Sequence, residues 1–410
     1  MWDTNINNEI YNIFAKIYLF FNKIDEVKKI LLNDNYNFIE LENIIGIEKL
    51  DDIKTKITNI ISKDKHDSND LQYLLEILLI IDYRLAVKIN NNKINMSKPL
   101  NTLFSDEIML FPKYDNLIEK RSGANISFNA KFKNILPIII HNNIKYNVLN
   151  HYIDSYESNK ELIIAAIPMQ NNIINKEEKY LKSLEKAIDE GANILISSEY
   201  SGNSELDDKI YDNIIKYPNI YFLFSPSYNN EGSNITKIFY KEKNLIKEAK
   251  YQKHYPFTIR GKIVEDIKYE EPTFHLFHVK GIGIFSVVIC KDFFSPQTDD
   301  FIKQTQLDCI FILSMTESYS EFNSKSSDVV RHKRVVLLCN DCEICIKKNL
   351  PSPVFYSHYS KKNGVDKNEI SSWIDIKCDY NCSKNYCYFF IKLKNNNKQI
   401  VLSDFNHKVG

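Results

Sequence analysis

The chain has 410 residues, which is enough for two or three domains. Hydrophobic residues make up 44% of the sequence and aromatic residues 12%, so a large core can form and wholesale disorder is not expected. Lysine plus arginine number 53, as do aspartate plus glutamate, and a net charge of zero argues against nucleic acid as an obligate partner.

The sequence shows no sign of secretion or of a membrane anchor. The N-terminus, MWDTNINNEI, lacks the basic and then apolar pattern of a signal peptide. The longest apolar candidate for a membrane span, residues 71–87, carries Glu76, Asp82 and Arg84. All eight cysteines lie at or after position 290, which is not the pattern of a secreted disulfide framework. These features predict a soluble cytoplasmic protein with reduced thiols.

The first 155 or so residues have the period of α-helices. Apolar residues recur every three or four positions between Ile10 and Leu31, and further helices are expected over residues 51–62 and after the polar stretch HDSND. No motif in this segment can be tied to chemistry. We therefore expect residues 1–157 to form a helical accessory domain that contributes no catalytic side chain and offers a surface to a protein partner.

From about Glu161 onward the pattern changes to alternating buried strands and helices. Repeated β-α-β units predict a layered α/β domain over residues 158–410. Strands are expected at 162–168, 193–197, 219–225 and 309–314, and helices at 176–190, 206–216, 301–306 and 326–338.

Three chemically distinctive residues follow predicted strands in this domain. Cys290 ends the apolar stretch VKGIGIFSVVICKDFF, Glu199 follows the strand at 193–197, and Lys253 follows the strand that ends at Tyr251. Each residue alone is more often a core thiol or a surface charge. Together at one sheet edge, the carboxylate could take the thiol proton and the thiolate could attack an electrophilic carbon. The lysine would then stabilise the thiolate and the oxyanion that forms next.

The order and surroundings of these residues resemble the nitrilase, or carbon–nitrogen hydrolase, superfamily over residues 161 to about 405. ANILISSEYSG is similar to the family's strand leading to its first catalytic glutamate, the hairpin ending in YQKHYPF to its lysine strand, and GIGIFSVVICKDFF to its nucleophile strand. The family's second glutamate falls between lysine and cysteine. Glu265 is the best-placed match, with Glu270 and Glu271 as rivals.

The resemblance implies a four-layer α-β-β-α sandwich. It also implies hydrolysis of a non-peptide carbon–nitrogen bond, with an amide favoured over a nitrile as the substrate, and no metal or organic cofactor. Glu199 would be the general base and Cys290 would form a thioester with the acyl group. Lys253 would hold the oxyanion together with the backbone N–H of Lys291. Glu265 would position Lys253 and the departing amine or incoming water. The resemblance also implies a homo-oligomer built by pairing sandwiches.

Some positions depart from the family pattern and leave the substrate open. Ser198 stands where the family usually has proline, and Lys291 where an aromatic residue is common, while Asn349 is a candidate match to a family asparagine. We expect Lys291, Tyr200 and Met315 to bind substrate. Lys291 and Arg260 would favour a carboxylate or phosphate on it.

Two other classes of function stay open at this stage. One is a nitrilase-like module that senses a metabolite and signals to a partner protein, and another is an N-acyltransferase that passes the thioester to an amine.

A metal site is a weaker candidate. Cys339, Cys342 and Cys345 form C-x2-C-x2-C, and Cys378, Cys382 and Cys387 follow. Residues 342–347 alternate like a strand, however, so buried thiols are the preferred interpretation and no metal is expected.

Overall fold

The computed structural model describes residues 13–21, 50–63, 65–90, 108–112, 135–139, 146–153, 161–169, 175–217, 219–242, 245–259, 262–263, 265, 267–268, 270–279, 282–305, 307–330, 334–359, 370–371, 385–396 and 399–410. The chain divides into two compact units, Met1–Ile144 and Lys145–Gly410. This division lies earlier than the boundary expected at 157, because strand β3 (Asn147–Ile153) pairs with β12 (Thr273–Val279) in the second unit.

The first unit contains helices and one short sheet. Residues 13–21 are helical, and α4 (Leu50–Ile61) and α5 (Ser68–Asn90) follow. Their apolar faces form one buried cluster, which includes Phe14, Ile57 and Leu74. β1 (Ile108–Pro112) and β2 (Ile135–Ile139) pair antiparallel, a feature that the helical period did not predict. The rest of the helix expected between Ile10 and Leu31 lies outside the described residues.

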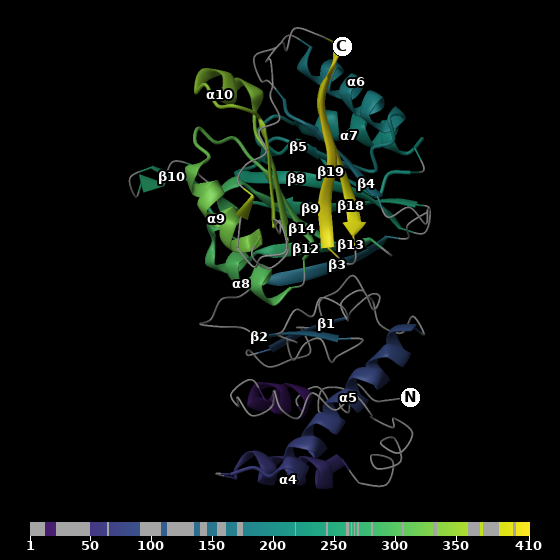
Figure 1. Ribbon diagram of the computed structural model, residues 1–410, viewed down its shortest axis with the longest axis vertical. Coiled ribbons are helices and arrows are strands. Elements are labelled where there is room, and N and C mark those ends of the chain that lie inside the picture. The colour runs from purple at the N-terminus through teal and green to yellow at the C-terminus, as the bar shows by residue number, and fades with distance from the viewer. Residues whose placement is uncertain are drawn as a thin grey trace. The chain divides into compact units, whose positions relative to one another are not determined.

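The second unit has mixed α/β structure built on two large sheets (Figure 1). The first sheet has the strand order β17-β16-β15-β14-β13-β12-β3, and the second has the order β19-β18-β4-β5-β6-β8-β7, with β9 paired to β8. The strands of the first sheet besides β3 and β12 are β13 (Gly283–Ile289), β14 (Cys309–Leu313), β15 (Val335–Cys339), β16 (Val354–Tyr359) and β17 (Ile370–Ser371). Those of the second are β4 (Glu161–Ile167), β5 (Ile194–Ser197), β6 (Phe222–Phe224), β7 (Tyr228–Asn230), β8 (Ser233–Glu242), β9 (Leu245–Gln252), β18 (Cys387–Asn396) and β19 (Gln399–Val409).

Aromatic side chains join the two sheets. Phe222 of β6 lies with its ring centroid 5.2 Å from that of Phe277 of β12, and Phe224 lies 5.5 Å from Phe311 of β14. Strands covered on both sides need no polar face, so every residue of β13 is buried, as its run of apolar or small residues predicts. The two sheets are therefore held in a fixed relation, which matters because the candidate site draws on both.

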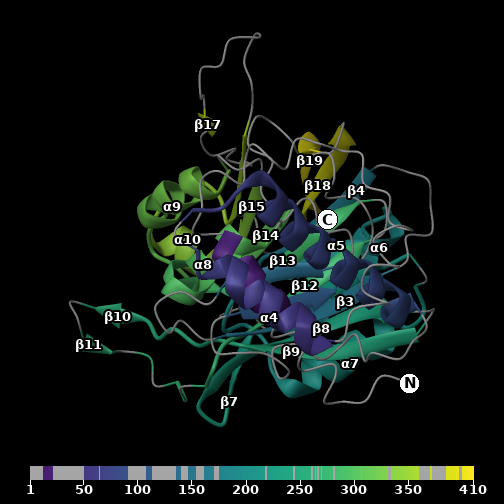
Figure 2. The same cartoon turned by 90° about the horizontal axis from the view of Figure 1, so that it is seen from below.

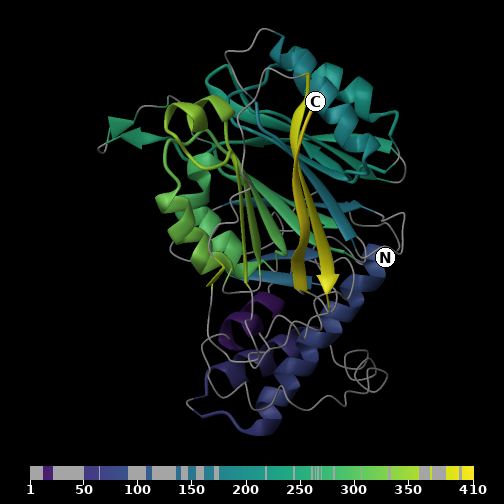
Figure 3. The same ribbon diagram turned by 45° about the horizontal axis from the view of Figure 1, so that its top comes forward.

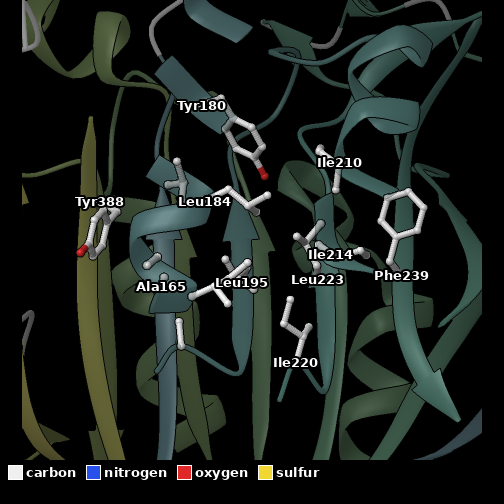
Figure 4. Close-up of a cluster of buried hydrophobic side chains, with 14 of the residues drawn as sticks. Ala165, Tyr180, Leu184, Leu195, Ile210, Ile214, Ile220, Leu223, Phe239 and Tyr388 are labelled. Carbon is white, nitrogen blue, oxygen red and sulfur yellow. The ribbon is translucent and has the colours of Figure 1, made fainter. Parts of the chain in front are cut away.

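Helices cover the outer faces of the sheets (Figure 3). α6 (Lys176–Asp189) and α7 (Ser204–Ile214) pack on the second sheet, where Leu184 and Ile210 meet Leu195 and Leu223 in a buried cluster (Figure 4). The first sheet carries α8 (Pro296–Gln304), α9 (Ser320–Val330) and α10 (Cys342–Lys347) at its strand connections.

Two expectations about local structure are wrong. The helix expected at 326–338 ends at Val330, and Val335–Cys339 is the strand β15. The sequence VVLLC is apolar enough for either element, and burial between β14 and β16 selects the strand. The segment 342–347, expected as a strand, is the helix α10, because the Asp341 side chain accepts hydrogen bonds from the N–H groups of Glu343 and Ile344.

A small antiparallel pair stands out from the body of the second unit (Figure 2). It consists of β10 (Thr258–Ile259) and β11 (Lys262–Ile263), between Lys253 and Glu265. Beyond it the chain returns, and the N–H of Glu265 donates to the carbonyl of Phe257 at 3.4 Å. In neither unit do the described helices include one with the length and apolarity needed to cross a bilayer.

Candidate active site

Strand ends from both sheets meet at one place. Parallel pairing sets the ends of β13 and β14 side by side, with Ile289 opposite Leu313, so Cys290 and Ser314 are neighbours. From the other sheet, the N–H of Glu199 donates to the carbonyl of Ser314 at 3.2 Å. The backbone therefore ties the end of β5 to the end of β14 and brings Glu199 to Cys290.

Lys253 completes the cluster from the end of β9. Its Nζ lies 2.8 Å from Oε1 of Glu199 and 2.6 Å from Oε2 of Glu265. The Lys253 side chain is 1% exposed and those of Glu199 and Glu265 are 2% and 10% exposed. Buried charges of this kind are tolerated only when they are paired, and the pairing fixes all three side chains.

Cys290 lies against the carboxylate of Glu199. Its thiol donates a hydrogen bond to Glu199, and Ser314 Oγ lies 3.7 Å from the Cys290 sulfur. The backbone N–H of Met315 donates to the other oxygen of Glu199 at 3.0 Å. Cys290 has a φ of 45°, in the left-handed region that residues other than glycine rarely adopt. Such strain persists only where the surrounding structure enforces it, and it is concentrated at functional sites.

The ionisation of the cluster differs from the expectation that Lys253 would hold Cys290 as a thiolate. Burial raises the pKa of the Cys290 thiol to about 12, with the charge of Glu199 adding to the rise and Lys253 only partly opposing it. Burial also raises the pKa of Glu199, against the pull of Lys253. Cys290 therefore carries its proton at neutral pH and needs the adjacent Glu199 to remove it.

Lys253 itself stays charged. Burial alone would lower the pKa of its ammonium, but the opposing charges of Glu199, Cys290 and Glu265 raise it above its usual value. A permanent buried cation at this position can stabilise negative charge that develops on a neighbouring atom.

Of the three candidates for a second glutamate, only Glu265 joins the cluster. Burial favours its neutral form, yet the Lys253 ammonium and hydrogen bonds from the Tyr200 hydroxyl and the Phe257 N–H hold its pKa below the usual value. Glu270 and Glu271 are exposed. Glu265 is thus an ionised partner of Lys253.

Asn234, which we did not predict from the sequence, lies between the two glutamates. It is completely buried near the start of β8, and its Nδ2 donates to Oε1 of Glu199 at 2.9 Å and to Oε1 of Glu265 at 3.4 Å. Its backbone carbonyl also accepts the N–H of Lys253 at 2.8 Å. The stretch NITKIFY also contains Thr236 and Lys237, so no local signal singles out Asn234.

Asp292 was also missed. This fully buried carboxylate, two residues after Cys290, accepts the N–H groups of His254 at 3.1 Å and Tyr255 at 2.7 Å and the hydroxyl of Tyr251 at 2.8 Å. It therefore binds the turn that carries the thiol to the segment that carries Lys253. Burial raises its pKa, while His254 and Lys253 oppose the rise.

Local geometry explains the position of the turn after β5. Ser198, which stands where the resembling family has proline, accepts the N–H of Met169 at 3.0 Å and hydrogen-bonds Ser201. Tyr200 has a φ of 55°. At Gly202 an added Cβ would lie 2.2 Å from the carbonyl oxygen of Pro226, so only glycine allows this close approach.

Of the three residues expected to bind substrate, Met315 and Tyr200 contact residues of the cluster, and Lys291 pairs with Glu321. Met315 contributes its backbone N–H to Glu199, and Tyr200 places its ring 5.9 Å from Lys253 Nζ. The Lys291 ammonium is 2.6 Å from Glu321 and lies over the rings of Phe294 and Phe257, at 4.8 and 5.9 Å.

Two other positions were singled out in the sequence, Asn349 and Arg260. Asn349 is exposed, with a φ of 51°. Arg260 falls outside the described residues.

The three cysteines of the C-x2-C-x2-C motif all lie within the described part of the chain. Cys339 ends β15, and Cys342 and Cys345 lie on α10, all three buried. Cys345 Sγ is 3.2 Å from Asn340 Nδ2 and 3.3 Å from the Tyr319 hydroxyl. Within the described ranges, no three histidine, cysteine, aspartate or glutamate side chains are arranged to bind a metal ion. Cys378 and Cys382 lie outside those ranges.

Comparisons with known proteins give only distant likenesses. No protein-family model matches the chain, and no curated protein sequence matches it. Among solved structures, it is similar to a glutamine-dependent NAD+ synthetase from Acinetobacter baumannii, with a TM-score of 0.42 and 14% identity over 60% of this chain and 48% of the synthetase. The chain thus spans about half of the synthetase.

Two further similar structures have lower scores. An amidase from Nesterenkonia sp. has a TM-score of 0.35 and 14% identity over 44% of this chain and 76% of the amidase. Saccharomyces cerevisiae Nit3, a member of branch 10 of the nitrilase superfamily, has a TM-score of 0.34 and 13% identity over 44% of this chain and 76% of Nit3. At TM-scores below 0.5, these likenesses are too distant to assign a family or an activity.

Proposed function

We propose that this protein is a thiol hydrolase of a non-peptide carbon–nitrogen bond, with a four-layer α-β-β-α nitrilase-like sandwich as its catalytic domain. The observation that carries the proposal is the buried cluster in which the Cys290 thiol touches Glu199 while Lys253 bridges Glu199 and Glu265. A nucleophile, a base with a raised pKa and a fixed cation are the three groups that acyl transfer needs.

In the first half of the reaction, Glu199 takes the Cys290 proton as the sulfur attacks the carbonyl carbon of the substrate. This order follows from the raised thiol pKa, because a neutral thiol is a poor nucleophile until a base removes its proton. Lys253, with the backbone N–H of Lys291, stabilises the oxyanion. Glu199 then gives the proton to the nitrogen, the C–N bond breaks, and the acyl group stays on sulfur as a thioester.

In the second half, water attacks the thioester. Glu199 takes a proton from the water, the C–S bond breaks, and the sulfur recovers its proton as the acid leaves. Glu265, which contacts Lys253 and Tyr200, holds Lys253 in place throughout, and we assign it the further role of positioning the incoming water. No step needs a metal or an organic cofactor.

A panel of primary amides and nitriles, scored by release of ammonia, tests this proposal. Cys290→Ala and Glu199→Gln should each abolish release, because one removes the nucleophile and the other the base. Cys345→Ala is the matched control, since it removes a buried thiol outside the cluster and should retain activity. If no amide or nitrile is hydrolysed, or if Cys290→Ala is as active as wild type, the proposal is wrong.

Several expectations remain predictions at this point. They are a cytoplasmic location, a homo-oligomer formed by pairing sandwiches, and a protein partner that binds through residues 1–157. Light scattering of the full chain at micromolar concentration tests the second of these directly.

A further inference from the structure

Asn234 has one hydrogen-bonding atom that is not used. Its Nδ2 donates to the carboxylates of Glu199 and Glu265. Ionised carboxylates only accept hydrogen bonds, so this pairing fixes which end of the Asn234 amide is the nitrogen. The remaining atom, Oδ1, is buried and has no hydrogen-bond partner. Buried polar atoms are almost always satisfied, and an exception in a reactive cluster calls for an explanation.

The groups that contact the Asn234 side chain do not supply the missing donor. Glu199 and Glu265 present acceptors, and the Lys253 ammonium is engaged with both of them. Oδ1 is bonded to the same carbon as Nδ2, so it belongs to the same buried cluster as the Glu199 carboxylate that Nδ2 contacts. In the proposed reaction that carboxylate delivers a proton to the leaving nitrogen. The leaving nitrogen is therefore a donor group that must reach this cluster.

We propose that Asn234 Oδ1 accepts an N–H from the leaving nitrogen of the substrate, and that the site is built for amides whose nitrogen carries hydrogen. The inference rests on the proposed hydrolase function and names its substrate class. Nδ2 and Oδ1 act together: Nδ2 holds Glu199, and Oδ1 holds the nitrogen to which Glu199 returns the thiol proton. The nitrogen leaves as ammonia or a primary amine. A nitrile nitrogen and an ester oxygen offer no hydrogen to Oδ1.

The experiment compares an amide with the methyl ester of the same acyl group, using the primary amide that is hydrolysed fastest in the panel above. In Asn234→Ala, kcat/KM for the amide should fall at least about tenfold further than kcat/KM for the ester, as expected for one lost hydrogen bond. Loss of the Nδ2 contact to Glu199 also weakens proton delivery, which the amide nitrogen needs more than the ester oxygen does. A larger loss on the amide therefore supports Oδ1 only together with the second measurement below, which needs no variant. Retained ester hydrolysis also shows that the variant is folded. Equal losses on the two substrates would overturn the assignment and leave Asn234 as a positioning residue for Glu199.

A second measurement uses the wild-type protein and does not depend on the variant being folded. The ester forms the acyl-enzyme, and hydroxylamine and methanol compete for it at equal concentrations. If Oδ1 binds N–H groups, the ratio of hydroxamate to methyl ester should exceed the ratio for a simple thioester in solution by at least about tenfold. The same ratio as in solution would contradict the proposal.

Failure of the hydrolase function and failure of the Oδ1 role give different results. If wild type hydrolyses neither amide nor ester, the hydrolase function itself fails. If it hydrolyses both and the amide-to-ester ratio is unchanged in Asn234→Ala, only the role of Oδ1 fails.

Discussion

Lys253 Nζ lies 2.8 Å from Glu199 Oε1, and both side chains are at most 2% exposed. With Glu265 also within 2.6 Å, one cation separates two buried carboxylates. Replacing Lys253 by methionine keeps the volume but leaves the carboxylates facing each other.

We expect Lys253→Met to lower the free energy of unfolding at pH 7 by about 3–5 kcal/mol, because buried charges are left uncompensated. This loss of stability should become smaller as the pH falls towards 5. Without the lysine, the facing carboxylates of Glu199 and Glu265 have pKa values above those of the unfolded chain, so they bind protons and become neutral. Urea unfolding at several pH values measures both effects. Lys237→Met is the control, because its partly exposed pair with Glu248 contributes at most about 1 kcal/mol. A loss that does not depend on pH would contradict the explanation.

Asp292 should act on catalysis through the Lys253 segment. Asp292→Asn weakens the hydrogen bonds to the N–H groups of His254 and Tyr255, so we expect a loss of about 1–3 kcal/mol in unfolding free energy and a fall in kcat of about tenfold or more. Asp300→Asn is the control for this variant. It removes a buried carboxylate that binds Tyr146, so it should reduce stability without changing kcat. Equal kcat values for the two variants would show that Asp292 is only structural.

A cluster of buried histidines predicts how stability depends on pH. His275 Nδ1 lies 2.8 Å from His151 Nε2, and burial lowers the pKa of His275 to about 4 and that of His278 to about 3, with His151 lowered too. These folded values lie below the unfolded value of about 6.5. Their stabilising effect is therefore complete above pH 6.5 and is lost progressively as the pH falls towards 4.

Substituting His275 tests this cause. Between these limits, each buried histidine should make the free energy of unfolding fall by about 1.4 kcal/mol for each pH unit of acidification. His275→Gln should therefore reduce the slope of unfolding free energy against pH by about that amount. The measurement is urea unfolding from pH 4.5 to 7.5. An unchanged slope would show that other groups cause the acid instability.

Lys291 should select substrates by charge. Its ammonium lies beside Phe257, whose N–H donates to Glu265, and pairs with the exposed Glu321. Lys291→Ala should raise KM for succinamate about tenfold and leave KM for butyramide within about twofold. Glu321→Ala should lower KM for succinamate, and 0.5 M salt should weaken both effects. Identical changes for the two amides would rule out a charge contact.

Part of this structure could be predicted from the sequence because its signals are local. Runs of apolar or small residues such as Ile284–Ile289 indicate buried strands, and Glu199, Lys253 and Cys290 could be grouped because each follows a predicted strand. The expected single sheet edge is wrong, because these strands belong to two sheets and β9 runs antiparallel to β8. Their geometry agrees with that grouping, while their catalytic roles remain predictions.

Other features depend on contacts between distant segments. Asn234 and Asp292 gain their roles from partners on other strands, which no local pattern shows. The protonated state of Cys290 follows from burial, a tertiary property that outweighs the lysine. Polar and apolar side chains alternate over residues 342–347 as in a strand, but the Asp341 side chain caps the N-terminus of a helix there.

Mapping an acyl adduct tests the central claim, a thioester on Cys290, most directly. The full chain is mixed with a hydrolysed amide, quenched in acid within milliseconds, and analysed by intact mass and peptide mapping. We predict that the mass of the acyl group will appear on the Cys290 peptide, disappear with hydroxylamine, and be absent from Cys290→Ala. An adduct on another residue, or hydrolysis by Cys290→Ala at the wild-type rate, would contradict the account.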